Sequence, residues 1–149
     1  MTGIKRLRQL QFGVETTSGT AITPTIRWRG EGVLDDQRRP TLVDSDLGYW
    51  MQSDEAFIDE NAVEIVLVPT PATYEQLPIL VAGQLGGSTN GASEGSGFLY
   101  SLTLPTSSPI APTTFTVRGG DNQQAEEVGY CYVREFTLAG DGDGPLNMS

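Results

Sequence analysis

Residues 61–87, NAVEIVLVPTPATYEQLPILVAGQLGG, contain the clearest strand and the clearest helix of the sequence. Ala62 to Val68 is a short run of β-branched and apolar residues, which is the length and composition of a buried β-strand. Thr70 and Pro71 end this run. The strand and the element after it therefore form the centre from which the rest of the fold is worked out.

The stretch after the two prolines predicts a helix over about residues 73–85. Thr73 with Gln76 fits a capping box, and the Gly86–Gly87 pair supplies a stop. Pro78 cannot donate a backbone hydrogen bond, so we expect it in a distorted first turn. Apolar residues recur at helical spacing on one face that would pack against a sheet: Tyr74, Leu77, Leu80, Val81 and Leu85.

Most of the remaining chain predicts strands and turns. Residues 25–34 alternate as a half-solvated strand does, and their two glycines suggest a bulge or the close approach of another backbone. Gly/Ser-rich residues 86–97 predict a flexible turn or linker, and residues 140–149 a hairpin turn that leads into a further strand. Three later runs each alternate with one aromatic, core-facing side: residues 98–104, 114–118 and 130–139.

Two segments lack a regular period. Residues 1–23 read as a basic N-terminal arm with a turn at Thr16 to Thr20, and the arm is either mobile or a docking element. Residues 35–56 form a long irregular loop, and such loops are usually functional or disordered. Aromatic residues argue against disorder and favour an interface with a partner, with packing over the chain's own domain as the alternative. The interface candidates are Leu42, Leu47, Tyr49, Trp50 and Met51.

Composition limits the classes of protein to consider. The chain has 149 residues, which is the size of a single domain with a substantial core. Its 9 Lys and Arg against 19 Asp and Glu give a net charge of −10, which argues against a surface that binds nucleic acid. The single Cys131 excludes an intrachain disulfide and is expected to be a small core or sheet residue. No stretch resembles a signal peptide or a membrane-spanning helix, so we expect synthesis in a cytoplasm.

Catalysis and metal binding are not expected. The chain has no histidine, which is the commonest general base and the commonest metal ligand. Cys131 therefore lacks a histidine partner for nucleophilic catalysis. The acidic turns at Asp141 and Asp143 and at Asp44 and Asp46 do not continue to the acidic residue that a calcium-binding loop requires. We predict a protein that is not an enzyme and that needs no cofactor or metal.

The order of these elements resembles the tail tube (major tail) proteins of long-tailed bacteriophages. The resemblance covers most of the chain from Phe12 onward and lies in the order of elements and in loose local patterns. Its most telling pieces are the turn from Glu15 to Ala21, the helix that ends in Leu85-Gly86-Gly87, and the C-terminal stretch GYCYVREFTLAG.

The family implies a mainly β fold, a β-sandwich or partial barrel with one flanking helix and a long interface loop. Its subunits form rings in which neighbouring sheets join as an inner β-barrel, and the rings stack into a hollow tube. Residues 35–56 then reach a neighbouring subunit or ring. Double-stranded DNA passes without specific binding, since an acidic lumen would repel its backbone. Glu64 and Glu135 are the candidate lumen-facing residues; the alternative is that each faces bulk water.

The resemblance also implies partners and a location. The first partner is the chain itself, in a hexameric ring, or in a trimer if these residues are part of a longer two-domain chain. Tape-measure, tail-terminator and baseplate proteins are further expected partners, and a membrane is not. The chain would assemble in the cytoplasm of a bacterial host and end in the virion tail. The alternative function is a monomeric β-sandwich module that binds carbohydrate or a receptor on a virion or cell surface.

Overall fold

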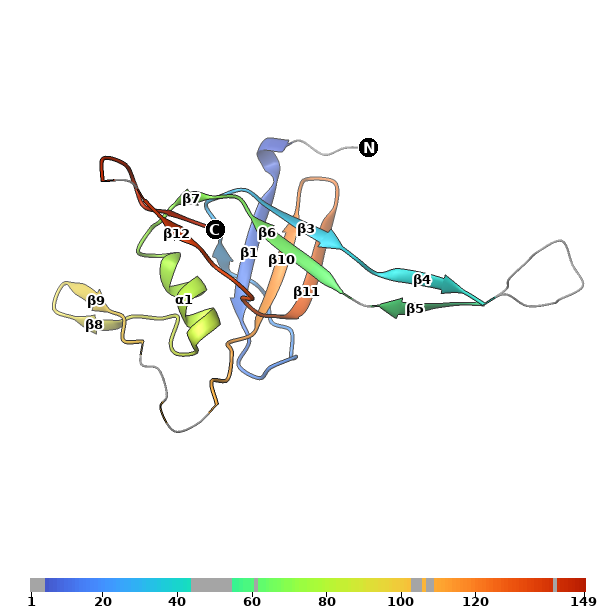
Figure 1. Ribbon diagram of the computed structural model, residues 1–149, viewed down its shortest axis with the longest axis horizontal. Helices are drawn as coiled ribbons and strands as arrows, with labels where there is room; N and C mark the ends of the chain where they lie inside the picture. Colours follow the sequence, from blue (N-terminus) through green and yellow to red (C-terminus); the bar gives the residue numbers. More distant parts are fainter. Residues whose placement is uncertain (1–4, 44–54, 61, 103–105, 107–108, 141) are drawn as a thin grey trace, which may run out of the picture. The chain divides into compact units, whose positions relative to one another are not determined.

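A computed structural model describes residues 5–43, 55–60, 62–102, 106, 109–140 and 142–149. These residues are mainly β, with one α-helix among them (Figure 1). They divide into two compact units: the main unit, Met1–Gly32 with Leu67–Ser149, and the hairpin unit, Val33–Val66. The assignment of the whole chain to a single domain stays a prediction.

A four-stranded antiparallel sheet forms the centre of the main unit. The sequence of its strand β1, QLQFGV, alternates polar and apolar residues, which places Leu10 and Phe12 on one face. β1 pairs with β10 from Gln9 opposite Gly120 to Val14 opposite Phe115. The order is β11-β10-β1-β2, with β1 (Gln9–Val14), β2 (Ile26–Arg27), β10 (Phe115–Gly120) and β11 (Ala125–Cys131).

The core of the main unit lies on the apolar face of this sheet. The Phe12 ring makes edge-to-face contacts with the rings of Trp28 and Phe115, at centroid distances of 5.9 and 6.3 Å. Leu10 and Val117 are buried beside them. Burial of each such side chain stabilises the folded state by about 1.5–3 kcal/mol.

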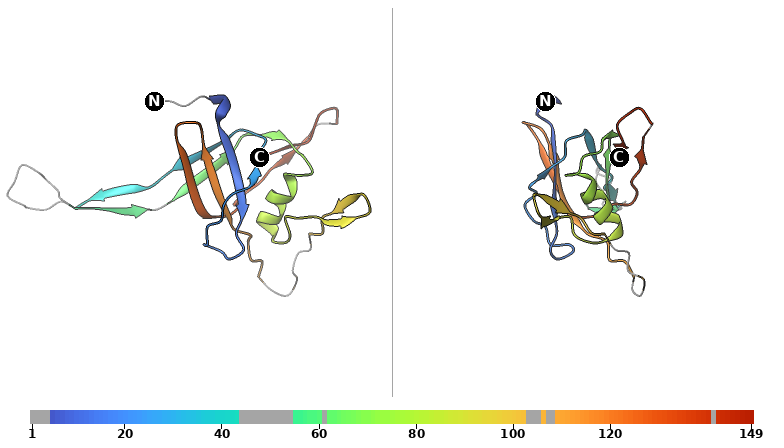
Figure 2. Two further views of the ribbon diagram at one scale, coloured as in Figure 1. Left: turned by 180° about the vertical axis from the view of Figure 1, so that it is seen from behind. Right: turned by 90° about the vertical axis from the view of Figure 1, so that its left-hand side faces the viewer.

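Helix α1 (Leu77–Leu85) lies against the same apolar face (Figure 2). Its buried residues include Ile79, Leu80 and Gly83. A Cβ atom at position 83 would lie 2.6 Å from Val133 Cγ2 and 2.9 Å from Phe115 Cε2. Glycine costs about 1 kcal/mol relative to alanine inside a helix, so close packing explains why the position has no side chain.

The helix is shorter than the predicted range of 73–85. Its N-cap is Gln76, and Tyr74 lies before the helix with 91% of its surface exposed, so the prediction that Tyr74 belongs to the apolar helix face is wrong, whereas Leu80 of that face is buried. The Thr73 carbonyl accepts bonds from the N–H groups of Gln76 and Leu77, which makes a turn in place of the predicted capping box. The reason is Pro78, because proline is tolerated only in the first turn and the helix starts just before it.

Two other features of this helix are confirmed. Pro78 falls within the first turn, as predicted. The helix ends at Gly86, which has a φ of 73°, and Gly87 follows with a φ of 123°. Glycine adopts these conformations without the steric cost that a Cβ atom would bring.

Short strands complete the main unit. Met148 is fully buried, and its strand pairs with residues 138–139, which confirms the hairpin predicted for the C-terminal stretch. A three-stranded sheet has the order β12-β13-β7, with β7 (Thr70–Pro71), β12 (Leu138–Ala139) and β13 (Asn147–Met148). The remaining elements are the 3-10 helix η1 (Lys5–Leu7) and the hairpin of β8 (Ala92–Glu94) with β9 (Gly97–Leu99).

The predicted strand over residues 130–139 is interrupted. β11 ends at Cys131 and β12 begins only at Leu138. Tyr130 and Tyr132, predicted to face the core, are exposed, whereas Val133 approaches the helix. A bulge near Tyr130, described below, breaks the alternation that the prediction assumed.

Three further predictions of local structure are corrected. Residues 1–23 are not an arm throughout, because Gln9–Val14 is the central strand β1. In the described part of the strand predicted over 98–104, only residues 98–99 belong to a strand, β9, and Phe98 is exposed. The strand predicted over 25–34 is divided between β2 and β3 (Gly32–Asp36), and the groups closest to Gly30 are the Trp28 and Thr70 side chains rather than another backbone.

The hairpin unit consists of two successive two-stranded ladders. β3 pairs with β6 (Val63–Leu67), and β4 (Arg39–Leu42) pairs antiparallel with β5 (Ala56–Glu60). The described part of residues 35–56 is therefore mostly strand, which corrects the prediction of an irregular loop. β6 was predicted to be buried but alternates between half-buried and exposed residues, and among the described residues its sheet contains only β3 besides itself.

Candidate functional site

The four-stranded sheet has a polar face opposite its core. The register places one residue from each strand in a row across this face: Arg27, Gln11, Arg118 and Glu127. Arg118 Nε donates to Glu127 Oε2 at 2.7 Å, and Arg27 Nη2 donates to Gln9 Oε1 at 3.2 Å. Both contacts are exposed, so the ion pair contributes only about 0.2–1 kcal/mol to stability. We call this set the polar row.

Both edges of the sheet are open in the part of the chain that the structure describes. There, β11 pairs with β10 alone, and β2 pairs with β1 alone. Strand direction alternates through the sheet, so β2 and β11 run antiparallel to each other. An open edge presents unpaired N–H and C=O groups, which are a template for another chain. A second copy can therefore continue the sheet without breaking its antiparallel order.

A hollow of about 510 Å³ adjoins β2, lined by Arg27 and Arg29 among others. Arg29 Nη2 forms an ion pair with Glu75 Oε2 at 2.5 Å. The Gln76 side chain also lines the hollow, and its buried Nε2 has no acceptor among the described residues. Two arginines against one glutamate make this edge of the sheet locally basic in an acidic chain.

Glu15 holds one end of the sheet together and is 7% exposed. Its carboxylate accepts hydrogen bonds from the N–H groups of Gly19 and Tyr130, both at 2.8 Å, and from the Thr116 hydroxyl at 3.0 Å. Burial by itself would raise the pKa of Glu15, but these backbone and hydroxyl donors outweigh it and leave the pKa below its ordinary value of 4.5. The ionised carboxylate thus joins β1, the turn after it, β10 and β11.

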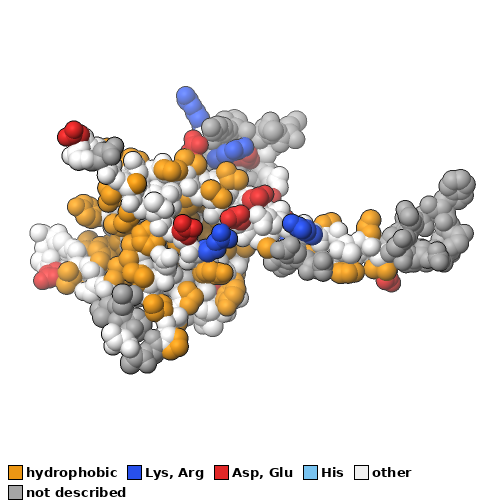
Figure 3. Space-filling model, viewed as in Figure 1, with side chains coloured by type: hydrophobic (Ala, Val, Ile, Leu, Met, Phe, Trp, Pro, Cys, Tyr) orange, Lys and Arg blue, Asp and Glu red, His pale blue; other side chains and the backbone are white. Residues whose placement is uncertain are grey.

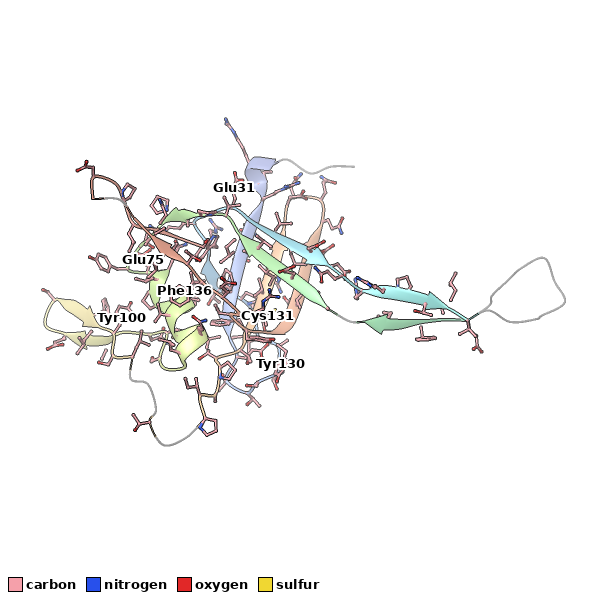
Figure 4. All side chains as sticks on the ribbon, viewed as in Figure 1. Glu31, Glu75, Tyr100, Tyr130, Cys131 and Phe136 are labelled. Carbon is pink, nitrogen blue, oxygen red and sulfur yellow. The ribbon has the colours of Figure 1, made fainter. Side chains whose placement is uncertain are left out.

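Tyr130 has a φ of 59° and is the one residue other than glycine with positive φ in the described part of the chain. The register shifts here, so that Gly129 and Tyr130 lie opposite the single residue Thr116 as a β-bulge. A left-handed conformation costs a non-glycine residue about 1–2 kcal/mol. The bond from the Tyr130 N–H to Glu15 offsets this cost, and the ring lies at the end of β11 with 61% of the residue exposed (Figure 4).

Cys131 follows the bulge as the last residue of β11. Burial and, to a smaller extent, the charge of Glu15 raise the pKa of its thiol to about 11. The thiol is therefore neutral at physiological pH and a poor nucleophile. This placement confirms the prediction of a small sheet residue.

The β4–β5 ladder of the hairpin unit exposes apolar side chains, some of which are visible in Figure 3. Phe57 and Ile58 are successive residues of β5, so they point to opposite faces, and they are 52% and 56% exposed. A lone two-stranded hairpin is marginally stable in water. A single copy of the chain thus leaves apolar side chains uncovered on both faces of this ladder.

The predicted interface residues fall in the same region of the chain. Leu42 is the last residue of β4 and is exposed. Leu47 and residues 49–51 (Tyr49, Trp50 and Met51) lie outside the described residues. The role of all of them at an interface stays a prediction.

Neither predicted lumen-facing residue belongs to the four-stranded sheet. Glu64 lies in β6 of the hairpin unit, where its Oε2 accepts a hydrogen bond from Gln37 Nε2 at 3.2 Å. Glu135 is exposed in the connection between β11 and β12. Their role in a lumen stays a prediction.

Sequence reasoning missed the polar row and the Glu15 contacts. The alternation of QLQFGV was the available signal for Gln9 and Gln11, but it lay inside the segment assigned to an arm. The Glu15 donors could not be found in this way, because Thr116 and Tyr130 are more than ninety residues away from it in sequence.

Among the described residues, no group of three or more His, Cys, Asp or Glu side chains is placed to hold a metal ion. No helix in the same residues is both long and apolar enough to cross a membrane.

The open edges, the polar row and the apolar faces of the β4–β5 ladder are thus the surfaces that the chain offers to a partner. Compared with protein-family models, with characterised proteins and with solved structures, the chain matches none of them.

Proposed function

We propose that the chain is a structural protein that assembles head-to-tail with copies of itself into closed rings, and that the rings stack into the hollow tail tube of a long-tailed bacteriophage. The protein performs no enzymatic step. The observation that carries the proposal is the open four-stranded sheet, which has one buried face, one polar face and two antiparallel edges.

Edge-to-edge association explains how a ring would form. If β2 of one copy pairs with β11 of the next, two different surfaces meet at every joint. Such a heterologous contact produces a ring when the rotation closes and a filament when it does not. Closure removes both open edges, which would otherwise be sites of uncontrolled aggregation. The core and α1 occupy one face of each sheet, so the polar face is the one left to line the lumen.

The hairpin unit supplies the second kind of contact in this proposal. Its exposed Phe57 and Ile58, together with Leu42, offer apolar area to a neighbouring copy or ring. This supports the role predicted for residues 35–56. Contacts with tape-measure, tail-terminator and baseplate proteins belong to the proposal through the family resemblance alone.

The charged residues of this sheet change the charge that we expect for the surface of the lumen. The polar row contains two arginines and one glutamate, although the whole chain carries −10. The row also holds Gln11, and Gln9 lies beside it on the same face. An acidic lumen would therefore depend on side chains outside this sheet, such as Glu64 and Glu135.

Assembly of the purified protein tests the proposal. Light scattering over a range of concentrations, followed by negative-stain electron microscopy, should show rings or tubes with a central hole. A chain that stays monomeric at every concentration would contradict the proposal and favour the alternative, a binding module. Open filaments without rings would mean that the edge contact forms but does not close.

A further inference from the structure

We infer that the rings close through one antiparallel register, in which Arg27 of one copy lies directly opposite Glu127 of the next. The inference rests on the proposed function, because it specifies the joint between two copies. Three properties of the sheet select this register: the direction of the free backbone groups, the face that each side chain occupies, and the side chains that would meet.

The first property is the direction of the Arg27 backbone. The Trp28 N–H donates to the Leu10 carbonyl at 2.8 Å, and this bond flanks the pair of Arg27 with Gln11. In antiparallel ladders, pairs that exchange hydrogen bonds alternate with pairs that do not. Arg27 and Gln11 are a pair that does not exchange hydrogen bonds. The N–H and C=O of Arg27 therefore point away from β1, toward the open edge.

The same alternation fixes the direction of the Glu127 backbone. The Asp121 N–H donates to the Gln124 carbonyl at 2.8 Å across the turn between β10 and β11. Counting along the ladder from this bonded pair, Arg118 and Glu127 are an odd number of steps away. They do not exchange bonds either, so the N–H and C=O of Glu127 point away from β10. Both edges thus present free backbone groups at the polar row.

The second property is the face of each side chain. Arg27 and Glu127 lie in the polar row, whereas Ile26 and Val128 pair with Phe12 and Val117 on the apolar face. Residues directly opposite each other across an antiparallel joint share a face. The joint must continue the polar face of one copy into the polar face of the next, and it must bring outward-pointing N–H and C=O groups together. Only every second residue of β11 can therefore lie opposite Arg27. These residues are Ala125, Glu127 and Gly129.

The third property favours Glu127 among these three. In this register the Arg27 guanidinium meets a carboxylate, and Ile26 meets Val128 on the apolar face. Both apolar residues are only half-buried in one copy, so the joint would cover them. Glu127 would lie between Arg118 of its own copy and Arg27 of the next, so its carboxylate would have a guanidinium on each side.

The other two registers bring unsuitable groups together. With Ala125 opposite Arg27, the guanidinium would face a methyl group and Ile26 would lie opposite Glu126 in place of Val128, so the joint would lose both its charge pair and its apolar pair. With Gly129 opposite Arg27, Ile26 would meet Tyr130. The bulge and positive φ at Tyr130 interrupt the regular ladder at that point.

Cysteine cross-linking tests directly which residues of β2 and β11 lie opposite each other in the joint. The variant Arg27→Cys with Glu127→Cys is made in a Cys131→Ser background. In the proposed joint the two Cα atoms would be about 5.5 Å apart, which is within reach of a disulfide. Within one copy the two residues lie on opposite edges of the sheet, about 14 Å apart at the usual strand spacing, so an intrachain disulfide cannot form. Mild oxidation should give a series of bands from covalent multimers on a non-reducing gel.

The matched control is Arg27→Cys with Ala125→Cys in the same background. Ala125 lies on the same face as Glu127, and its N–H and C=O also point toward the open edge, but it is two residues away along β11. This variant should therefore give no covalent multimers. Ile26→Cys with Val128→Cys is a second positive pair, which reports the proposed register from the apolar face. Circular dichroism checks that each variant is folded.

The outcomes separate the register from the proposed function. If the control variant formed covalent multimers and the two positive pairs did not, the proposed register would be overturned. If the wild-type chain forms rings and no pair cross-links, the joint uses other surfaces, and the inference fails while the proposed function stands. If the wild-type chain stays monomeric at every concentration, both fail.

Discussion

Glu15 is the residue on which the end of the four-stranded sheet most depends. Its buried carboxylate accepts bonds from Gly19, Thr116 and Tyr130, which belong to three different segments. The Thr116 hydroxyl in turn accepts a bond from the Ile22 N–H at 3.0 Å. Hydrogen bonds to a charged group contribute more than neutral ones, about 1.5–3 kcal/mol. The charge of Glu15 therefore matters more than its shape.

The substitution Glu15→Gln tests this role of the charge. We expect the free energy of unfolding at pH 7, measured with urea, to fall by about 1.5–3 kcal/mol. The folded-state pKa of Glu15 lies below 4.5, so its contribution is present above the unfolded pKa and is lost as the pH falls through the folded value. The wild-type chain should therefore lose more stability between pH 7 and pH 3 than the variant.

Glu126→Gln is the matched control, because Glu126 is exposed on the same sheet. It should leave the free energy of unfolding within about 0.5 kcal/mol of the wild-type value. Equal effects of the two substitutions, or an unchanged acid response in Glu15→Gln, would contradict the assignment.

At the scale of the element, the β4–β5 ladder has apolar side chains but no core. Because Phe57 and Ile58 point to opposite faces of this two-stranded ladder, one covering layer cannot bury both. A second copy on each face, or one copy that wraps the ladder, would bury them. The stability of the ladder is therefore expected to depend on assembly.

Replacing both Phe57 and Ile58 with alanine separates assembly from folding. Both residues are exposed in one copy, so the free energy of unfolding of the monomer should change by no more than about 0.5 kcal/mol per site. Light scattering should show that half-assembly needs a concentration about tenfold higher, which corresponds to about 1.4 kcal/mol per contact. Tyr74→Ala, at an even more exposed aromatic of the main unit, should change neither quantity. Normal assembly of the double variant would remove the ladder from the interface.

At the scale of the whole molecule, the net charge of −10 opposes association of identical copies. The proposed joint includes one exposed pair of opposite charges, worth about 0.2–1 kcal/mol, and this attraction is too small to cancel the repulsion. Salt screens both, with a Debye length of about 30 Å at 0.01 M and about 8 Å at 0.15 M.

Assembly should therefore be promoted by salt. We expect the concentration needed for ring formation, measured by light scattering at pH 7, to fall as sodium chloride rises from about 0.01 to 0.15 M, the range over which screening reaches the separation of neighbouring charges. Sucrose at matched osmolality serves as the control for effects other than screening. Weaker assembly at the higher salt concentration would mean that attraction between opposite charges dominates the joint.

Local chemistry allowed part of this fold to be predicted. The mainly β composition, the helix in residues 73–85, the position of Pro78 and the stop at Gly86 depend on neighbours within a few residues. The structure confirms these features, with an error of a few residues at the start of the helix. The C-terminal hairpin was found for the same reason.

The sequence by itself thus determined which segments are strands or helix wherever backbone conformation depends on adjacent residues, as in β10 and α1. Only the tertiary structure decided which strands are neighbours, and with them the polar row, the open edges and the surroundings of Glu15. Tyr130 illustrates the physical reason. Its place in an alternating aromatic run predicted a buried ring, but a carboxylate more than a hundred residues away holds its backbone in a bulge and leaves the ring exposed.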